Sequence, residues 1–98
     1  MEKYGTEHLH DDEEIRLITD GCAYFDIRDE HDDWVRVETR KGDLIIVPAG
    51  MYHRLTLDEN RYVTMRRVFA IRDHWAAYNR PAEDVEARQN YLRSIQVA

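Results

Sequence analysis

The sequence has few of the features that mark secreted and membrane proteins. Its single cysteine, Cys22, excludes an internal disulfide bond, and because it stands in an apolar strand we expect a small buried side chain. No apolar run approaches the roughly 20 residues of a membrane-spanning helix. The polar, charged N-terminus does not resemble a signal peptide. We therefore expect a cytoplasmic protein, with the nucleus as a second location if the source is eukaryotic.

Positive charge is also scarce. The formal net charge is -6, which opposes binding to nucleic acid, where Lys and Arg must replace the counterions of phosphate. The hydrophobic fraction of 43% and the charged fraction of 35% are typical of a soluble globular domain. A chain of 98 residues predicts one domain, 1–98, with a modest core.

Short candidate strands separated by turn residues run through most of the chain. Six of them are expected, at 15–19, 22–28, 34–38, 43–47, 53–57 and 62–71. The dipeptide Asp20-Gly21 between the first two is a strong hairpin signal. This pattern predicts an all-β, mainly antiparallel sandwich or barrel.

The C-terminal segment has a different pattern. Arg80-Pro81 interrupts the chain, and residues 82–95 carry helix formers with apolar positions at helical spacing. Pro81 suits the first turn of that helix. We expect residues 1–73 to form the barrel, and residues 74–98 to form a C-terminal segment whose short helix packs outside it.

Three histidines and one glutamate have the order and spacing of a metal site. On a strand, His8 and His10 point to the same face. An extended chain would carry Glu14 roughly 13 Å from His10, so residues 11–13 must turn and Glu14 must open the next strand. His53 has to return from a distant strand, which requires a closed antiparallel β fold. Imidazole and carboxylate without thiolate favour a divalent first-row metal.

Arg16 lies two residues after Glu14 and is expected to face the same pocket. A buried arginine needs a partner, which an anionic substrate would supply. The alternative is a simple ion pair with a carboxylate. Single residues outside this set have simpler explanations: residues 11–13 suit a solvated turn, and His31 suits a solvated loop.

These residues together resemble the two sequence motifs of the cupin barrels. The first is HxHxxxE followed by Gly21, seven residues after the glutamate. The second is G-x5-PxG-x2-H, which runs from Gly42 through Pro48 and Gly50 to His53.

One cupin family is resembled more closely, from about Tyr4 to about Tyr91. The chain is similar to the C-terminal part of the acireductone dioxygenases. The resemblance is carried by EHLHDDEEIR at 7–16, CAYFDIRD at 22–29, KGDLIIVPAGMYHR at 41–54 and WAAYNRPAEDVEAR at 75–88. Members of this family are usually nearly twice as long. The resemblance therefore implies a cupin, or double-stranded β-helix (jelly-roll), barrel that is incomplete.

The resemblance also implies a metal site and a substrate pocket. It makes His8, His10, Glu14 and His53 the ligands of one Fe(II) or Ni(II) per chain, and makes Arg16 catalytic. It assigns substrate contact to Arg16, Arg67, Trp75, Tyr4 and Leu55. Their alternatives are an ion pair at Arg67, a core aromatic at Trp75 and a frayed terminus at Tyr4, while at Leu55 family members often have phenylalanine.

The function that this resemblance implies is a metal-dependent acireductone dioxygenase of methionine salvage. It would cleave 1,2-dihydroxy-3-keto-5-methylthiopentene with dioxygen. The Fe form would give formate and 4-methylthio-2-oxobutanoate, and the Ni form formate, carbon monoxide and methylthiopropionate. The alternatives are a truncated, non-catalytic cupin that acts as a protein-interaction module, and another cupin enzyme such as a sugar or small-acid isomerase. An incomplete barrel would expose sheet edges, which predicts a homodimer or a partner chain that completes it.

Overall fold

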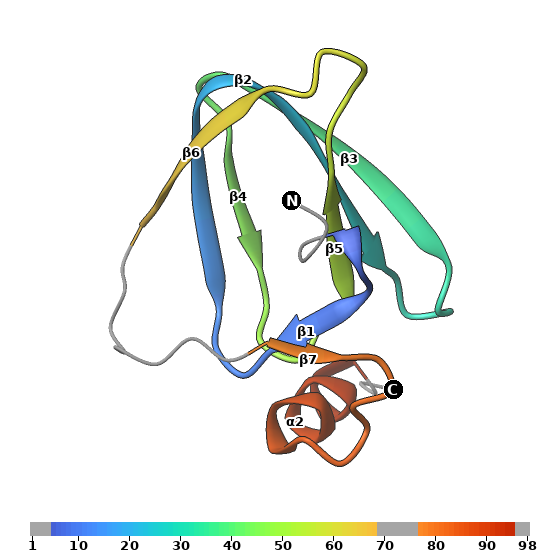
Figure 1. The fold of residues 1–98 in the computed structure, drawn as a ribbon. Helices are drawn as coiled ribbons and strands as arrows, with labels where there is room; N and C mark the ends of the chain where they lie inside the picture. Colours follow the sequence, from blue (N-terminus) through green and yellow to red (C-terminus); the bar gives the residue numbers. More distant parts are fainter. Residues whose placement is uncertain (1–4, 69–76, 96–98) are drawn as a thin grey trace.

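The computed structural model describes residues 5–68 and 77–95. Within them the chain forms an antiparallel β fold with one C-terminal helix (Figure 1), as the sequence predicts. The elements are β1 (His8–His10), β2 (Glu14–Arg28), β3 (Trp34–Arg40), β4 (Leu44–Val47), β5 (His53–Thr56), β6 (Val63–Arg67), β7 (Ala77–Asn79) and α2 (Glu86–Ile95).

The long strand β2 organises the fold because both halves of it pair with other strands. Its first half pairs with β4 and β6, so that Arg16 lies opposite Ile45 on one side and Arg67 on the other. Its second half pairs with β3 and β5, where Ile27 lies opposite Val35 and His53. The strands β5, β1 and β7 follow in order beyond β2. As Figure 1 shows, β2 and its partners curve around a common interior.

The expected hairpin at Asp20-Gly21 is wrong, because β2 continues through it. The register against β6 shifts between Ile18 and Asp20, which marks a β-bulge, and Gly21 has φ +74°. A β-carbon on Gly21 would lie 2.3 Å from the carbonyl oxygen of Tyr62. A bulge bends a strand and increases its twist. Gly21 therefore permits the bend in β2 between the half that pairs with β4 and β6 and the half that pairs with β3 and β5.

The other element boundaries differ less. The strand expected at 62–71 is described as Val63–Arg67, and the helix expected from residue 82 begins at Glu86. Residues 82–85 form a turn in which Val85 N–H donates to the Ala82 carbonyl at 3.2 Å. Pro81 therefore lies before that turn and not in the first turn of α2. The expected division after residue 73 falls outside the described residues and stays a prediction.

Two apolar clusters form the core. The larger one fills the interior between β2 and β4, with the partly buried Met51 and Met65 packed against it. Its fully buried members are Ile18, Ala23, Phe25 and Val47. The smaller cluster joins Leu9 of β1 and Tyr52 before β5 to Ala82 and Val85 of the C-terminal segment. This second cluster joins the C-terminal segment to β1 and to the turn before β5.

Cys22 is not the buried side chain that we expected. It is only partly buried, and its thiol donates to Asp58 Oδ2 at 2.6 Å. The pKa of the Cys22 thiol is raised, first because of this hydrogen bond to Asp58. The bulge next to Cys22 explains the difference, since it turns this part of β2 toward an open hollow lined by Asp58 and Tyr62.

The outward face of β4 is apolar and exposed. Leu44 is 56% exposed and Ile46 is 53% exposed. Within residues 5–68 and 77–95, β4 pairs with β2 and with no other strand. The described part of the chain also holds no helix long and apolar enough to cross a membrane.

Candidate metal centre

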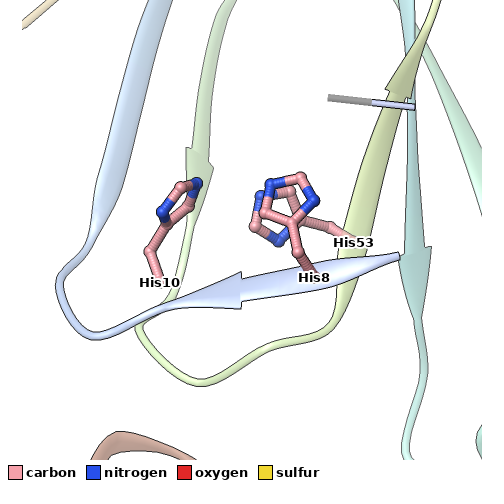
Figure 2. Close-up of side chains that lie close together, drawn as sticks. All are labelled: His8, His10 and His53. Carbon is pink, nitrogen blue, oxygen red and sulfur yellow. The ribbon is translucent and has the colours of Figure 1, made fainter. Parts of the chain in front are cut away.

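Three histidine side chains meet at the end of the interior where β1 crosses the fold. His8 and His10 point from the same face of β1, and His53 opens β5 directly opposite His8 in the register (Figure 2). One nitrogen of each ring lies within 4.8 Å of the corresponding atoms of the other two. All three residues are at most 3% exposed. The histidines that the sequence singles out therefore form a buried group that can hold a metal ion.

Hydrogen bonds fix the protonation of two of these rings. His8 Nδ1 lies 2.6 Å from the Thr6 carbonyl oxygen, and His53 Nδ1 lies 2.9 Å from the Met51 carbonyl oxygen. A carbonyl only accepts, so in each ring Nδ1 carries the proton and Nε2 presents its lone pair. Such a backbone partner on the far nitrogen is the usual support of a metal-binding histidine. Burial lowers the pKa of His8, which keeps its ring neutral near pH 7.

Glu14 brings a carboxylate to the same place. Its Oε2 lies 3.1 Å from His53 Nε2, and its Oε1 accepts a hydrogen bond from Arg16 Nε at 2.9 Å. Burial works against the charged carboxylate, but the Arg16 guanidinium beside it lowers the pKa of Glu14. Within the described residues, neither Glu14 Oε2 nor His53 Nε2 makes a hydrogen bond of good geometry. Two buried electron-pair donors that face each other without a proton between them fit a shared cation.

A pocket of about 350 Å³ opens beside this group, within the size range of small-molecule sites. Its lining combines charged and imidazole groups with apolar side chains. Its lining comprises His8, Glu14, Arg16, Phe25, His53, Leu55, Val63, Thr64 and Met65. A small anionic molecule with an apolar tail would match both kinds of lining group.

The structure brings most of the expected site residues together. Arg16 and Leu55 line the pocket together with His8, Glu14 and His53. Arg16 also makes the ion pair that we gave as its alternative. Arg67 lies opposite Arg16 in register on β6 but is exposed and is not among the lining residues. Tyr4 and Trp75 lie outside the described residues.

The apolar lining of the pocket was not predicted from the sequence. Phe25 lies opposite Leu55 in the register of β2 and β5, and Met65 joins this lining from β6. Alternation along β2 could have placed Phe25 on the inner face. Its nearness to His53 depends on strand pairing, which alternation does not encode.

Comparison with known proteins agrees with this geometry. A model of the ARD/ARD' family matches residues 1–77. The acireductone dioxygenase of Gallus gallus is 56% identical over 89 residues, 91% of this chain and 49% of that protein. That of Drosophila pseudoobscura pseudoobscura is 52% identical over 93 residues, 95% of this chain and 50% of that protein. The chain thus spans about half the length of the curated relatives it matches.

A solved structure is also similar. It is described as acireductone dioxygenase from Bacillus anthracis with cadmium ion in active center, and it aligns with a TM-score of 0.66 at 37% identity. The alignment covers 68% of this chain and 39% of that one. The match confirms the expected cupin fold. The extent of the family match and the identity to these relatives show that the chain belongs to the ARD/ARD' family.

Proposed function

We propose that this chain is the metal-binding, catalytic part of an acireductone dioxygenase of methionine salvage. The observation that carries the proposal is the buried histidine group, in which His8 and His53 already present their Nε2 lone pairs beside Glu14. The relatives named as acireductone dioxygenases and the cadmium-bound solved structure support the same function. Each chain would hold one Fe(II) or Ni(II), since three imidazoles and a carboxylate suit either metal.

The residues have separate roles in this proposal. His8, His10, His53 and Glu14 would hold the metal, which supplies a Lewis acid and a template for acireductone and dioxygen. Their burial keeps water away from the ligand atoms and strengthens the electrostatic contacts between them.

Arg16 lies in the pocket beside these ligands, where its guanidinium can stabilise the negative charge of the deprotonated acireductone while it remains paired with Glu14. Phe25, Leu55 and Met65 would pack against the apolar methylthio tail. Arg67 is a candidate second cation next to Arg16. Tyr4 and Trp75 remain proposed substrate contacts on the family resemblance.

The substrate would be 1,2-dihydroxy-3-keto-5-methylthiopentene. The expected products are formate and 4-methylthio-2-oxobutanoate for the Fe form, and formate, carbon monoxide and methylthiopropionate for the Ni form. Family membership argues against the isomerase alternative.

The test is acireductone-dependent oxygen uptake by protein that holds one Fe(II) per chain, with formate followed as product. We expect uptake with formate release by the unchanged chain. His53→Ala should lose the iron and the activity, whereas the matched control His31→Ala, in an exposed loop, should keep both. Iron retained at one per chain in His53→Ala would refute the ligand assignment. Arg16→Ala should keep the iron and lose turnover, and an unchanged rate would make Arg16 structural.

The exposed outer face of β4 favours a second candidate function. Among the described strands β4 pairs with β2 alone, and Leu44 and Ile46 give it an exposed apolar face. An exposed apolar edge strand of this type can pair with another chain. The chain would then associate through β4 with a second copy of itself or with a partner chain. If iron-loaded protein takes up no oxygen, the non-catalytic interaction module becomes the leading function. A stable monomer in light scattering would count against self-association.

A further inference from the structure

The turn that carries His53 is enclosed by the C-terminal segment. This turn, residues 48–52, joins β4 to β5, and Gly50 and Tyr52 are buried within it. A β-carbon on Gly50 would lie 2.2 Å from the Ala87 carbonyl oxygen of the α2 backbone. The helix therefore rests directly on the turn, with no space for even one more carbon between them.

Arg88 of α2 is the polar contact across this junction. It is 9% exposed, and its Nη1 donates to the Gly50 carbonyl oxygen at 3.2 Å. Its Nε donates to Glu83 at 3.3 Å, and its guanidinium lies 4.4 Å from the centre of the Tyr52 ring. Burying an arginine costs free energy unless its charge is paired and its donors make well-aligned hydrogen bonds. Here one guanidinium reaches both the backbone and the aromatic ring of the turn.

Tyr52 ties the same turn to the start of the C-terminal segment. Its hydroxyl donates to Glu83 Oε1 at 2.8 Å and accepts the Ala82 N–H at 2.7 Å. Its ring is fully buried, and the backbone carbonyl of Tyr52 accepts from Arg28 N–H at 3.0 Å. The residue immediately before His53 is thus held by its ring, its hydroxyl and its backbone.

These contacts lead directly to the histidines. The Gly50 carbonyl oxygen accepts the hydrogen bond from Arg88, and the Gly50 N–H donates to the His10 carbonyl oxygen at 2.9 Å. The next residue, Met51, supplies the carbonyl oxygen that orients the His53 ring. A shift of this turn would therefore move His53 and its orienting partner relative to His10.

The C-terminal segment also holds β1, the strand of the other two histidines. In the register of β7 and β1, His8 lies opposite Asn79 and His10 lies opposite Ala77. Arg80 extends this contact, because its backbone N–H donates to the Glu7 carbonyl oxygen at 3.1 Å and its side chain pairs with the Glu7 carboxylate at 2.8 Å.

From these contacts we propose that Arg88 is a positioning residue for the metal centre: through Gly50 and Tyr52 it sets where His53 stands relative to His8 and His10. The proposal rests on the metal centre proposed above. Residues that orient metal ligands in this way commonly change metal affinity by about 10- to 100-fold when they are replaced.

The experiment is a titration of the full chain with Co(II), whose visible absorption reports the ligand geometry. Arg88→Met keeps most of the apolar contact of the side chain and removes its donors. Arg93→Met is the matched control, since Arg93 is an exposed arginine in the last turn of the same helix. We expect a Co(II) Kd about 10- to 100-fold weaker and a changed spectrum for Arg88→Met, and neither change for Arg93→Met.

Arg88→Lys covers the case in which Arg88→Met does not fold. Lysine keeps the charge and the stem but cannot donate to Gly50 and Glu83 in the same planar arrangement, so an intermediate Kd is expected. Folded Arg88 variants with the Kd and spectrum of the unchanged chain would overturn the positioning role and leave the metal centre intact. Absence of Co(II) binding by the unchanged chain would overturn the metal centre itself, and this inference with it.

Discussion

Replacing Gly50 by alanine tests how closely the C-terminal helix rests on the turn that carries the third histidine. Gly50 has φ +80°, and Gly42 offers a matched control with φ +96° and no atom within 4 Å of an added β-carbon. Both substitutions place an L-residue in the left-handed region, at about 1–2 kcal/mol. Both also reduce the entropy of the unfolded chain by a similar amount, which cancels in the comparison.

Only Gly50→Ala adds a steric term, because its β-carbon would lie 2.2 Å from the Ala87 carbonyl oxygen and 2.9 Å from the Tyr91 β-carbon. One methyl group forced into a packed site costs about 1–3 kcal/mol. We therefore expect Gly50→Ala to lower the free energy of unfolding by about 1–3 kcal/mol more than Gly42→Ala does.

The assay is urea unfolding followed by tryptophan fluorescence, with the free energy taken by linear extrapolation. Circular dichroism at the helical minimum would show whether the loss lies in α2. Equal destabilisation by the two substitutions, within about 0.5 kcal/mol, would refute the reasoning, since the backbone cost would then explain everything and the helix would not rest on Gly50.

Three further predictions concern other contacts, and each is tested by the same urea unfolding unless another assay is stated. Tyr52→Phe leaves the buried Ala82 N–H without its acceptor and should lower the free energy of unfolding by about 1–2 kcal/mol. No measurable loss would argue against the burial of this contact between the turn and the C-terminal segment. Asp26 is 1% exposed and accepts hydrogen bonds from Arg36 and Arg54, so Asp26→Asn should cost about 2–3 kcal/mol. Glu38 pairs with Arg40 at the exposed surface, so the control Glu38→Gln should cost under about 1 kcal/mol; similar costs would contradict the burial of Asp26. The hydrogen bond from Arg36 lowers the pKa of Asp26 in the folded chain. The loss of stability caused by Asp26→Asn should therefore be complete above about pH 4 and should shrink as the pH falls through the lowered pKa of Asp26. Ile46→Lys, at a 53% exposed position, should leave the unfolding free energy within about 0.5 kcal/mol and reduce self-association in light scattering; unchanged association would exclude the β4 face as the contact.

The metal-ligand candidates could be found from the sequence because their placement rests on local rules. His8 and His10 share a face through strand alternation alone, and the turn before Glu14 follows from the reach of an extended chain. The structure has both features, with β1 ending at His10 and β2 beginning at Glu14.

The wrong prediction of a hairpin at Asp20-Gly21 shows what local sequence rules cannot predict. Glycine with positive φ serves a tight hairpin and a β-bulge equally well. What selects the bulge is the Tyr62 carbonyl, which lies where a β-carbon of Gly21 would stand and which accepts the Cys22 N–H at 3.2 Å. That neighbour is about 40 positions away in the sequence, so turn chemistry alone could not choose between the two.

The role of the C-terminal segment could not be predicted from local sequence rules either. Its helical spacing predicts a helix with an apolar face, but spacing does not name the surface that the face covers. Arg88 in particular looks like an ordinary charged helix residue, and its contact with Gly50 spans 38 positions. Strand β1 meets β5 in a single register pair, His8 with His53, so strand pairing alone joins these two elements weakly. The tail contacts both of them, through β7 on β1 and through α2 on the turn before β5. The histidine motif therefore supplies the ligand atoms, whereas their convergence at one point depends on a segment that carries none of them.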